Sequence, residues 1–432
     1  HTLSLHDALP ISSMNYDKAY ELARENYAEY GVDADKAIER LESFSLSLHC
    51  WQIDDVSGFE RPDAALEGGG IQVTGSYPGK PRNRGEFIQD LDKVYSLLPG
   101  SHRLSLHTHY GDFGGRKVDR NEIRPEHFRG WVDWSRRSGV DLDFNCTVFS
   151  HPLSDDGFSL SSKDEKKRSF WIDHVKRARE IGAYMGREQG NPCIHNIWLH
   201  DGIKDIPADR MGYRRILRDA LDAVFEKEYP EQEIKDAVEC KLFGIGSEAY
   251  VVGSHEFYMG YAYTRGKMLC LDLGHFHPTE SVADKISSVM LFSEELLLHV
   301  SRPIRWDSDH IVLLDDEVRR LFQEIVRSGR ESDIHVGLDF FDGTVNRVGA
   351  YAIGARNALK AMLLAYLEPA EKLVEYEEEG NYFGRLHLME ELKTLPFGSV
   401  WDRYCRSMGV PTDREIRDAV HAYERDVLSK RD

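Results

Sequence analysis

The sequence predicts an α/β protein built as a (β/α)8 TIM barrel, with helices before the barrel and a helical extension after it. Short strand-like runs alternate with longer amphipathic helical stretches, a pattern that implies parallel pairing of the strands. About eight such units follow one another, which is the number that closes a barrel. A doubly wound open sheet is the alternative, although no glycine fingerprint for a dinucleotide follows the first strand.

The elements follow in order along the chain. Residues 15–41 have helical periodicity with a break at Gly31. The strand-like runs are 45–51, 103–109, 141–147, 193–199, 237–243, 268–273, 296–301 and 334–340. The amphipathic helical stretches include 86–98, 126–138, 163–186, 209–227, 278–292, 315–328 and 345–367.

The ends of the chain are interpreted separately from the barrel. Residues 1–13 lack the basic and apolar regions of a secretory signal, so we expect translated flanking sequence ahead of Met14. Residues 14–367 are expected to hold the barrel with its N-terminal helices. Residues 368–432 are expected to form a charged helical extension, interrupted at 395–398 and at Pro411. With no export signal, the predicted location is cytoplasmic.

Composition excludes several classes of protein. The net charge is −19, from 55 basic and 74 acidic residues, which disfavours nucleic acid or an anionic membrane as a partner. No apolar run reaches the roughly 18 residues of a transmembrane helix. The six cysteines form no CxxC pair, so we expect buried reduced thiols rather than a zinc ribbon or a redox motif.

Polar residues alternate along several predicted strands. One parity of the second strand carries Ser105, His107 and His109, while Glu239 and Lys241 share a face of the fifth. In a barrel the apolar face of each strand meets the helices, so these polar side chains point inward. The carboxyl ends of barrel strands are also where barrel enzymes place their chemistry.

Acidic residues and histidines near the ends of the last four strands indicate metal binding. Each of these strands carries one candidate ligand: Glu239, Asp272, His299 and Asp339. This oxygen-rich set suits Mn²⁺, Mg²⁺ or Co²⁺. His275, Asp307 and Asp309, in the loops that follow, make a second candidate site.

The strength of this prediction lies in the number of ligands. An isolated acid pair is far more often a loop turn or a helix cap. Seven acids and histidines at successive strand ends, with only Lys241 among them as a cation, favour bound metal over a salt-bridged rim.

Other site residues have more than one interpretation. Lys241 is either an ion-pair partner of Glu239 or a donor to a substrate oxygen. His107 and His109 are equally well substrate groups or core histidines, and Trp51 and Trp198 are pocket walls or ordinary core. The long connection 54–85 carries Ile71, Val73 and Tyr77 and is a candidate lid.

Several longer motifs resemble one known family. They are HCWQ at 49–52, DDVSGFE at 54–60, KLFGIG at 241–246, GHFHPTE at 274–280, RPIRWDSDH at 302–310 and GLDFFD at 337–342. These motifs are similar to those of the L-rhamnose isomerase family, and the similarity runs from about Met14 nearly to the C-terminus. Residues 1–13 have no counterpart in it.

The resemblance implies a (β/α)8 barrel in a cytoplasmic homotetramer that interconverts L-rhamnose and L-rhamnulose with two divalent metal ions per subunit. Mn²⁺ is expected at the catalytic site, with Zn²⁺, Co²⁺ or Mg²⁺ as alternatives at the other. By resemblance, the catalytic ion is held by His275, Asp307 and Asp309. The substrate-holding ion is held by Glu239, Asp272, His299 and Asp339.

The same resemblance assigns Lys241, Trp198 and His107 to substrate contact, and we add Trp51 as a pocket wall. Lys241, Asp307 and Asp339 are the predicted catalytic residues. Since the carboxylates near the sugar are committed to metal, we predict a hydride shift from C2 to C1. The alternatives are another two-metal barrel isomerase or epimerase of broader aldose specificity, and a sugar-binding protein without turnover.

Overall fold

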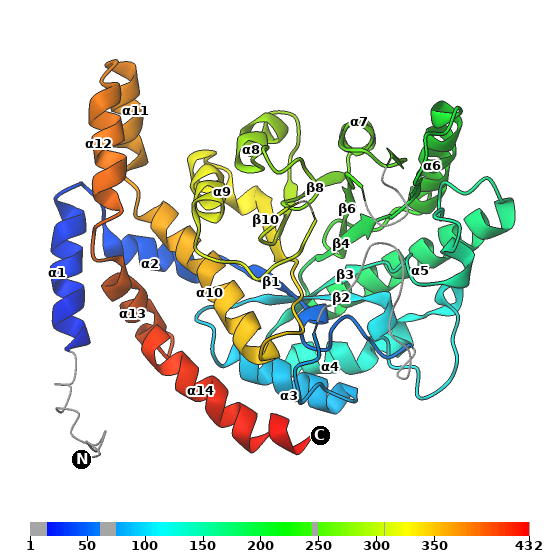
Figure 1. Ribbon diagram of the computed structural model, residues 1–432, viewed down its shortest axis with the longest axis horizontal. Helices are drawn as coiled ribbons and strands as arrows, with labels where there is room; N and C mark the ends of the chain where they lie inside the picture. The colour runs from blue at the N-terminus through cyan, green and yellow to red at the C-terminus, as the bar shows by residue number, and fades with distance from the viewer. Residues whose placement is uncertain (1–14, 61–74, 244–248, 306, 432) are drawn as a thin grey trace, which may run out of the picture.

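A closed parallel barrel forms the centre of the protein (Figure 1). The computed structural model describes residues 15–60, 75–243, 249–305 and 307–431. Around the barrel the strand order is β1-β10-β9-β8-β6-β4-β3-β2, which confirms the predicted TIM barrel and excludes the doubly wound sheet. The barrel strands are β1 (Leu46–His49), β2 (Arg103–His107), β3 (Asp141–Asn145), β4 (Cys193–Trp198), β6 (Ile234–Glu239), β8 (Met268–Asp272), β9 (Leu296–Val300) and β10 (Ile334–Leu338).

Helices precede, surround and follow the barrel (Figure 1). Before and around it lie α1 (Tyr16–Ala28), α2 (Ala34–Glu42), α3 (Arg84–Tyr95), α4 (Arg129–Ser138), α5 (Glu165–Gln189), α6 (Arg210–Phe225), α7 (His255–Arg265), α8 (Ala283–Met290), α9 (Asp316–Arg327) and α10 (Arg347–Tyr366). After it come α11 (Ala370–Glu378), α12 (Tyr382–Leu392), α13 (Phe397–Ser407) and α14 (Asp413–Asp426). Within the described ranges, no helix is both long enough and apolar enough to cross a bilayer.

Local sequence signals set where the helices begin and end. Asp315 caps α9 by accepting from the Val318 backbone amide at 3.1 Å. Gly190 ends α5 in the left-handed conformation, with φ of 73°. The buried Leu321, Phe322 and Ile325 of α9 lie on one helical face and pack toward the core.

Two parts of the observed fold differ from the sequence-based prediction. The fifth barrel strand ends at Glu239, so Lys241 lies in the following loop rather than on the strand. Helix α7 and the two-stranded sheet of β5 (Gly202–Ile203) and β7 (Tyr250–Val251) were not predicted. A two-residue strand carries no readable period, and its partner is far away in sequence.

The interior of the barrel has an apolar side and a polar side. Five inward residues on the apolar side form a separate buried cluster: Ile194, Ala237, Met268, Cys270 and Leu297. On the polar side Ser47 donates to Asp143, and Asn145 donates to Ser105. Strand register then brings Asp272 opposite His299 and Trp198 opposite Glu239. The inward ligands predicted from parity therefore converge at the carboxyl ends of the strands.

Candidate metal and sugar site

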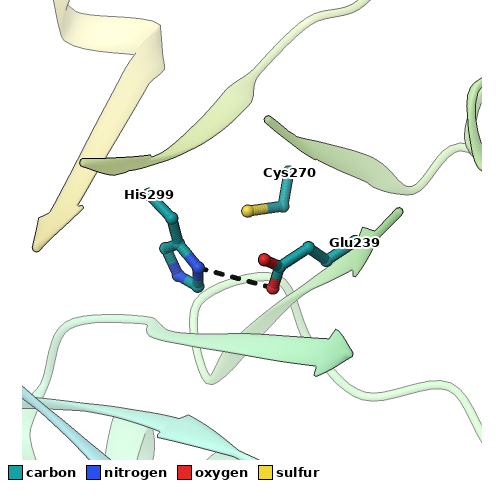
Figure 2. Close-up of side chains that lie close together, drawn as sticks. All are labelled: Glu239, Cys270 and His299. Carbon is teal, nitrogen blue, oxygen red and sulfur yellow. Dashed lines mark ion pairs between the residues drawn. The ribbon is translucent and has the colours of Figure 1, made fainter. Parts of the chain in front are cut away.

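The first ligand group lies at the carboxyl ends of four neighbouring strands. One ligand atom from each of Glu239, Asp272, His299 and Asp339 falls within 4.8 Å of the others. His299 Nδ1 lies 3.4 Å from Glu239 Oε2 and 3.5 Å from Asp339 Oδ2. Figure 2 shows the His299 and Glu239 side chains pointing toward each other from β9 and β6. Four residues that are distant in sequence thus share one small volume.

A second group adjoins the first and shares Asp272 with it. Asp272, His275 and Asp307 offer ligand atoms within 4.8 Å of one another. His275 Nε2 lies 3.3 Å from Asp307 Oδ2, while its Nδ1 lies 3.3 Å from Glu239 Oε1. Asp309 is not part of this compact triad, but it lines one cavity together with His275 and Asp307. The residues predicted for two ions therefore form one continuous cluster.

The loops that carry the second group are shaped by close approaches. A side-chain carbon added to Gly274 would lie 2.7 Å from Asp307 Oδ1, so any other residue would displace that carboxylate. The Gly274 amide donates to Asp272 Oδ1 at 2.6 Å. Asp309 has a positive φ of 42°, a conformation that non-glycine residues adopt rarely and mostly at functional sites.

The carboxylates of the cluster are crowded and short of cations. Burial raises the pKa of Asp272 well above its usual value, and the charges of Asp339 and Glu239 raise it further. Burial likewise raises the pKa of Asp309, with the Asp307 carboxylate adding to the shift, and raises the pKa of Asp339 to about 6. Repulsion between carboxylates adds to burial in these shifts, whereas nearby cationic groups lower the pKa of Glu239 and of Asp307.

The basic groups compensate only part of this charge. Burial opposes protonation of His299, but the Glu239 carboxylate overrides that effect and raises the pKa of His299 to about 9. The Lys241 ammonium lies 3.1 Å from Asp307 Oδ2 and packs 4.5 Å from the centroid of the Trp198 ring. Its partner is therefore Asp307, not the Glu239 expected from strand parity.

Unsatisfied polar atoms show that the cluster fits divalent cations. Asp272 Oδ2, His275 Nδ1 and His299 Nδ1 are buried, and none of them makes a hydrogen bond. Buried donors and acceptors without partners are costly, and carboxylate oxygens with imidazole nitrogens are ligands for Mn²⁺, Co²⁺ or Zn²⁺. The chemistry of the donors thus matches the predicted metal.

Cys270 is a further neighbour that the sequence-based prediction did not include. Its Sγ lies within 4.8 Å of ligand atoms of Glu239 and His299 (Figure 2). Burial raises the pKa of this thiol well above its usual value, which disfavours the thiolate that binds metal. All six cysteines are buried and free, as the sequence predicted.

A cavity opens above the cluster and collects the predicted sugar-contact residues. Its lining includes Trp51, His107, Trp198, Lys241 and the apolar Phe341. Trp51 Nε1 donates to Asp339 Oδ1 at 3.0 Å, so this tryptophan both walls the cavity and orients a ligand carboxylate. Its ring meets that of His107 edge-on at 4.8 Å between centroids. The cavity therefore combines polar groups with aromatic walls.

Further residues complete the site: His107 and His109 were candidates from sequence, whereas Thr147 and Asn196 were not singled out. His107 Nδ1 and His109 Nδ1 lie 3.0 and 3.1 Å from the same Thr147 hydroxyl. Since one hydroxyl has a single proton, it donates to one ring and accepts from the other. The Asn196 amide donates to Glu239. Inward parity on β3 and β4 was the available signal for Thr147 and Asn196.

Only part of the candidate lid is described. Ile71 and Val73 fall outside the described residues. The Tyr77 hydroxyl donates to Glu424 Oε1 of α14 at 2.5 Å, and its backbone amide donates to Gly343 O at 2.8 Å. Tyr77 therefore anchors the connection to α14 rather than facing the cavity. Residues 1–13 also lie outside the described part of the chain.

Comparison with known proteins gives matches along almost the entire chain. The family model described as L-rhamnose isomerase (RhaA) matches residues 14–431. The L-rhamnose isomerase of Rhodopirellula baltica is 57% identical over 417 residues, covering 96% of this chain and 97% of that protein. The enzyme of the same name from Bacteroides thetaiotaomicron is 54% identical, covering 96% and 98%.

Solved structures also resemble the chain, at much lower sequence identity. D-psicose 3-epimerase, crystallised in the presence of D-fructose, aligns with a TM-score of 0.48 at 11% identity. That alignment covers 75% of this chain and 100% of the epimerase chain.

Proposed function

The chain belongs to the L-rhamnose isomerase family, and we propose that it interconverts L-rhamnose and L-rhamnulose as a metal-dependent aldose–ketose isomerase. The observation that carries the activity is the 57% identity with a curated L-rhamnose isomerase over nearly the full length of both chains. Relatives of the same name at 54% and 52% identity support it.

We assign the metal-binding roles to the clustered acids and histidines. Glu239, Asp272, His299 and Asp339 would hold the ion that orients the sugar, and His275, Asp307 and Asp309 the catalytic ion. When bound, divalent ions such as Mn²⁺ supply Lewis-acid polarisation of the sugar oxygens. The crowded carboxylates, and the buried imidazole nitrogens that lie beside them without a hydrogen bond, support this assignment.

The remaining residues bind and orient the sugar. Lys241 Nζ, held by Asp307 and backed by the Trp198 ring, is positioned to donate to O1 as negative charge develops there. His107 contributes a neutral ring at the cavity wall. Trp51 keeps the Asp339 carboxylate in place and shields it from water.

The transfer of hydrogen between carbons is proposed to occur as a hydride shift from C2 to C1. An enediol route needs a base beside C2. Burial lowers the pKa of His107 to about 3, so its ring is a weak base. All the carboxylates that line the described part of the cavity are proposed metal ligands, and a bound cation lowers their basicity. With the ions bound, no free carbon base is left among these residues, which supports the hydride route.

An isotope experiment tests both the activity and the route. L-Rhamnose carrying deuterium at C2 is incubated with the enzyme in ordinary water, and C1 of the ketose is inspected by NMR at early conversion. Retention of deuterium at C1 is the expected result. Extensive washout would replace the hydride route by an enediol, and absence of ketose would reject the activity.

Specificity, location and assembly complete the proposal. We assign the enzyme to the cytoplasm as a homotetramer, with Mn²⁺ at the catalytic site. A second candidate, a two-metal isomerase or epimerase of broader aldose range, has the same site chemistry. Turnover across a panel of deoxyhexoses and hexoses separates the two candidates, and light scattering of the purified protein tests the tetramer.

A further inference from the structure

The barrel interior contains a second cavity, at the end opposite the sugar site. It encloses about 410 Å³ and is entered between residues that precede strands: Ser43 and Phe44 before β1, Asn191 before β4, and Ser332 before β10. This is the amino-terminal face of the barrel, which in most barrels is closed by layers of packed side chains. We call this space the rear cavity.

Small polar side chains create the rear cavity. Ser47, Ser105 and Gly337 occupy inward positions that bulky branched residues fill in most barrels. Ser105 is partly exposed although it sits in the middle of β2. The volume of the rear cavity, about 410 Å³, far exceeds the roughly 10–15 Å³ that one water needs. The rear cavity therefore lies between these small residues and the apolar cluster, of which Ile194 and Leu297 also line it.

The rear cavity reaches the back of the sugar site. Asn145, Asn196 and His299 line both the rear cavity and the cavity that holds the candidate ligands. The Asn145 amide donates to Ser105 Oγ at 2.7 Å. Asn196 is 3% exposed, and its Oδ1 has no hydrogen-bond partner in the protein. These three side chains form a thin partition with an acceptor left over for a further donor.

The charges around the rear cavity favour water as its occupant. Arg40 pairs with Glu331 at 2.7 Å, and Arg103 pairs with Asp143 at 2.7 Å. His335 lies 3.3 Å from Glu295. Because each charged group here has a partner, no net charge is left to select an anion or a cation. A neutral polar molecule that both donates and accepts hydrogen bonds fits best.

We propose that the rear cavity is a water-filled passage from solvent at the amino-terminal face to the partition behind the site, and that it stays open while a sugar occupies the front. The barrel is then open at both ends, with the sugar confined to one of them. The existence of the passage does not depend on the proposed function. The part of its test that adds L-rhamnose does rest on that function.

Cysteine accessibility tests the passage in the full-length protein. Ser105→Cys places a thiol of similar size beside the partition, and Phe341→Cys places one in the front cavity. Each variant is treated with methyl methanethiosulfonate with and without saturating L-rhamnose, and labelling is followed by mass spectrometry. The unsubstituted protein, whose cysteines are buried, supplies the background.

We expect L-rhamnose to slow labelling of the Phe341→Cys thiol about tenfold and to change labelling of the Ser105→Cys thiol less than about twofold. Adding Ser332→Trp, which fills the rear opening, should slow labelling of the Ser105→Cys thiol about tenfold, whereas the matched Ser332→Thr should not. Ser45 also lines the rear cavity, so Ser45→Trp serves as a second plug if Ser332→Trp fails to fold.

Three results would overturn the passage. They are equal protection of both thiols by sugar, no labelling of the Ser105→Cys thiol while the front thiol reacts, and unchanged labelling behind both tryptophan plugs. If L-rhamnose protects neither thiol, sugar binding at the front is rejected. In that case the plugged variants still decide whether the rear cavity is open.

Discussion

Strand β6 carries two buried acids three residues apart, and their surroundings differ sharply. Asp236 faces α5, where the Arg179 guanidinium donates to both of its oxygens at 2.9 to 3.1 Å and His195 Nδ1 lies 3.0 Å away. Glu239 faces the barrel interior among Asp272, Asp339 and two histidines, and no arginine of the described residues pairs with it.

The difference shows how to separate a structural acid from a functional one. Burial opposes ionisation of Asp236, but the His195 hydrogen bond and the Arg179 charge lower its pKa to about 2. Burial opposes ionisation of Glu239 as well, and the His299 charge lowers its pKa, but burial and the neighbouring carboxylates raise the pKa of Asp272 beside it. The charge of a buried acid that pairs with a guanidinium is already neutralised by the protein. Crowded acids without such a partner require a bound cation to neutralise them.

Among the tests of this comparison, removal of divalent ions should have the largest effect. Dialysis against a chelator is expected to abolish isomerase activity, and Mn²⁺ should restore it better than Ca²⁺, which prefers larger oxygen cages. The metal-free protein should keep its far-ultraviolet circular dichroism, since Arg179 still neutralises Asp236. Metal content is followed by mass spectrometry. Full activity in a sample shown to be metal-free would reject the metal assignment.

Exchanging each acid for its amide should separate the two clusters. Asp236→Asn leaves Arg179 buried beside a neutral group and should lower the free energy of unfolding by about 3–5 kcal/mol. Glu239→Gln should change it less, by about 1 kcal/mol, because His299 can release its proton once the carboxylate is gone, whereas Arg179 cannot. It should nevertheless reduce bound metal and sugar affinity. Urea unfolding and metal analysis of both variants provide the comparison. Equal loss of stability in the two variants would contradict it.

Two lysines offer a matched test of the same contrast. Lys241→Met should lower kcat about 10²–10³-fold while metal content stays normal, because a donor to the developing O1 charge is lost. Lys267, whose Nζ lies 3.8 Å from Asp236 Oδ2, is the control. Lys267→Met should leave kcat unchanged. A similar loss in both variants would show that Lys241 acts through the fold alone.

The smallest expected effect is a pH dependence of stability. The pKa of Asp236 is about 2 when folded and 3.8 ordinarily, so its charge stabilises the fold above pH 4. This contribution, about 2 kcal/mol, is lost as the pH falls through 2. Urea unfolding of metal-free protein between pH 6 and 2, with Asp236→Asn as reference, measures it. A difference between the two proteins that does not narrow on acidification would contradict the assignment.

Much of the site could be predicted from the alternation of residues along strands and from their spacing alone. Alternation along each strand identified the inward faces, so Glu239, Asp272 and His299 were found from sequence, and the order of strands placed their ends together. The longer motifs, such as GHFHPTE at 274–280, identified the family that the full-length matches then confirmed. These features are local, and a residue's neighbours in sequence are enough to reveal them.

Closure of the barrel determines side-chain partners and cavities that could not be predicted from the sequence. The pairing of Lys241 with Asp307 joins residues 66 apart, and that of Asp236 with Arg179 joins residues 57 apart. The rear cavity lies where Ser47, Ser105 and Gly337 fall side by side on the neighbouring strands β1, β2 and β10. Period-two alternation states which way a side chain points but not which partner it meets. Partners and empty space depend on strand register and closure, which are properties of the tertiary structure.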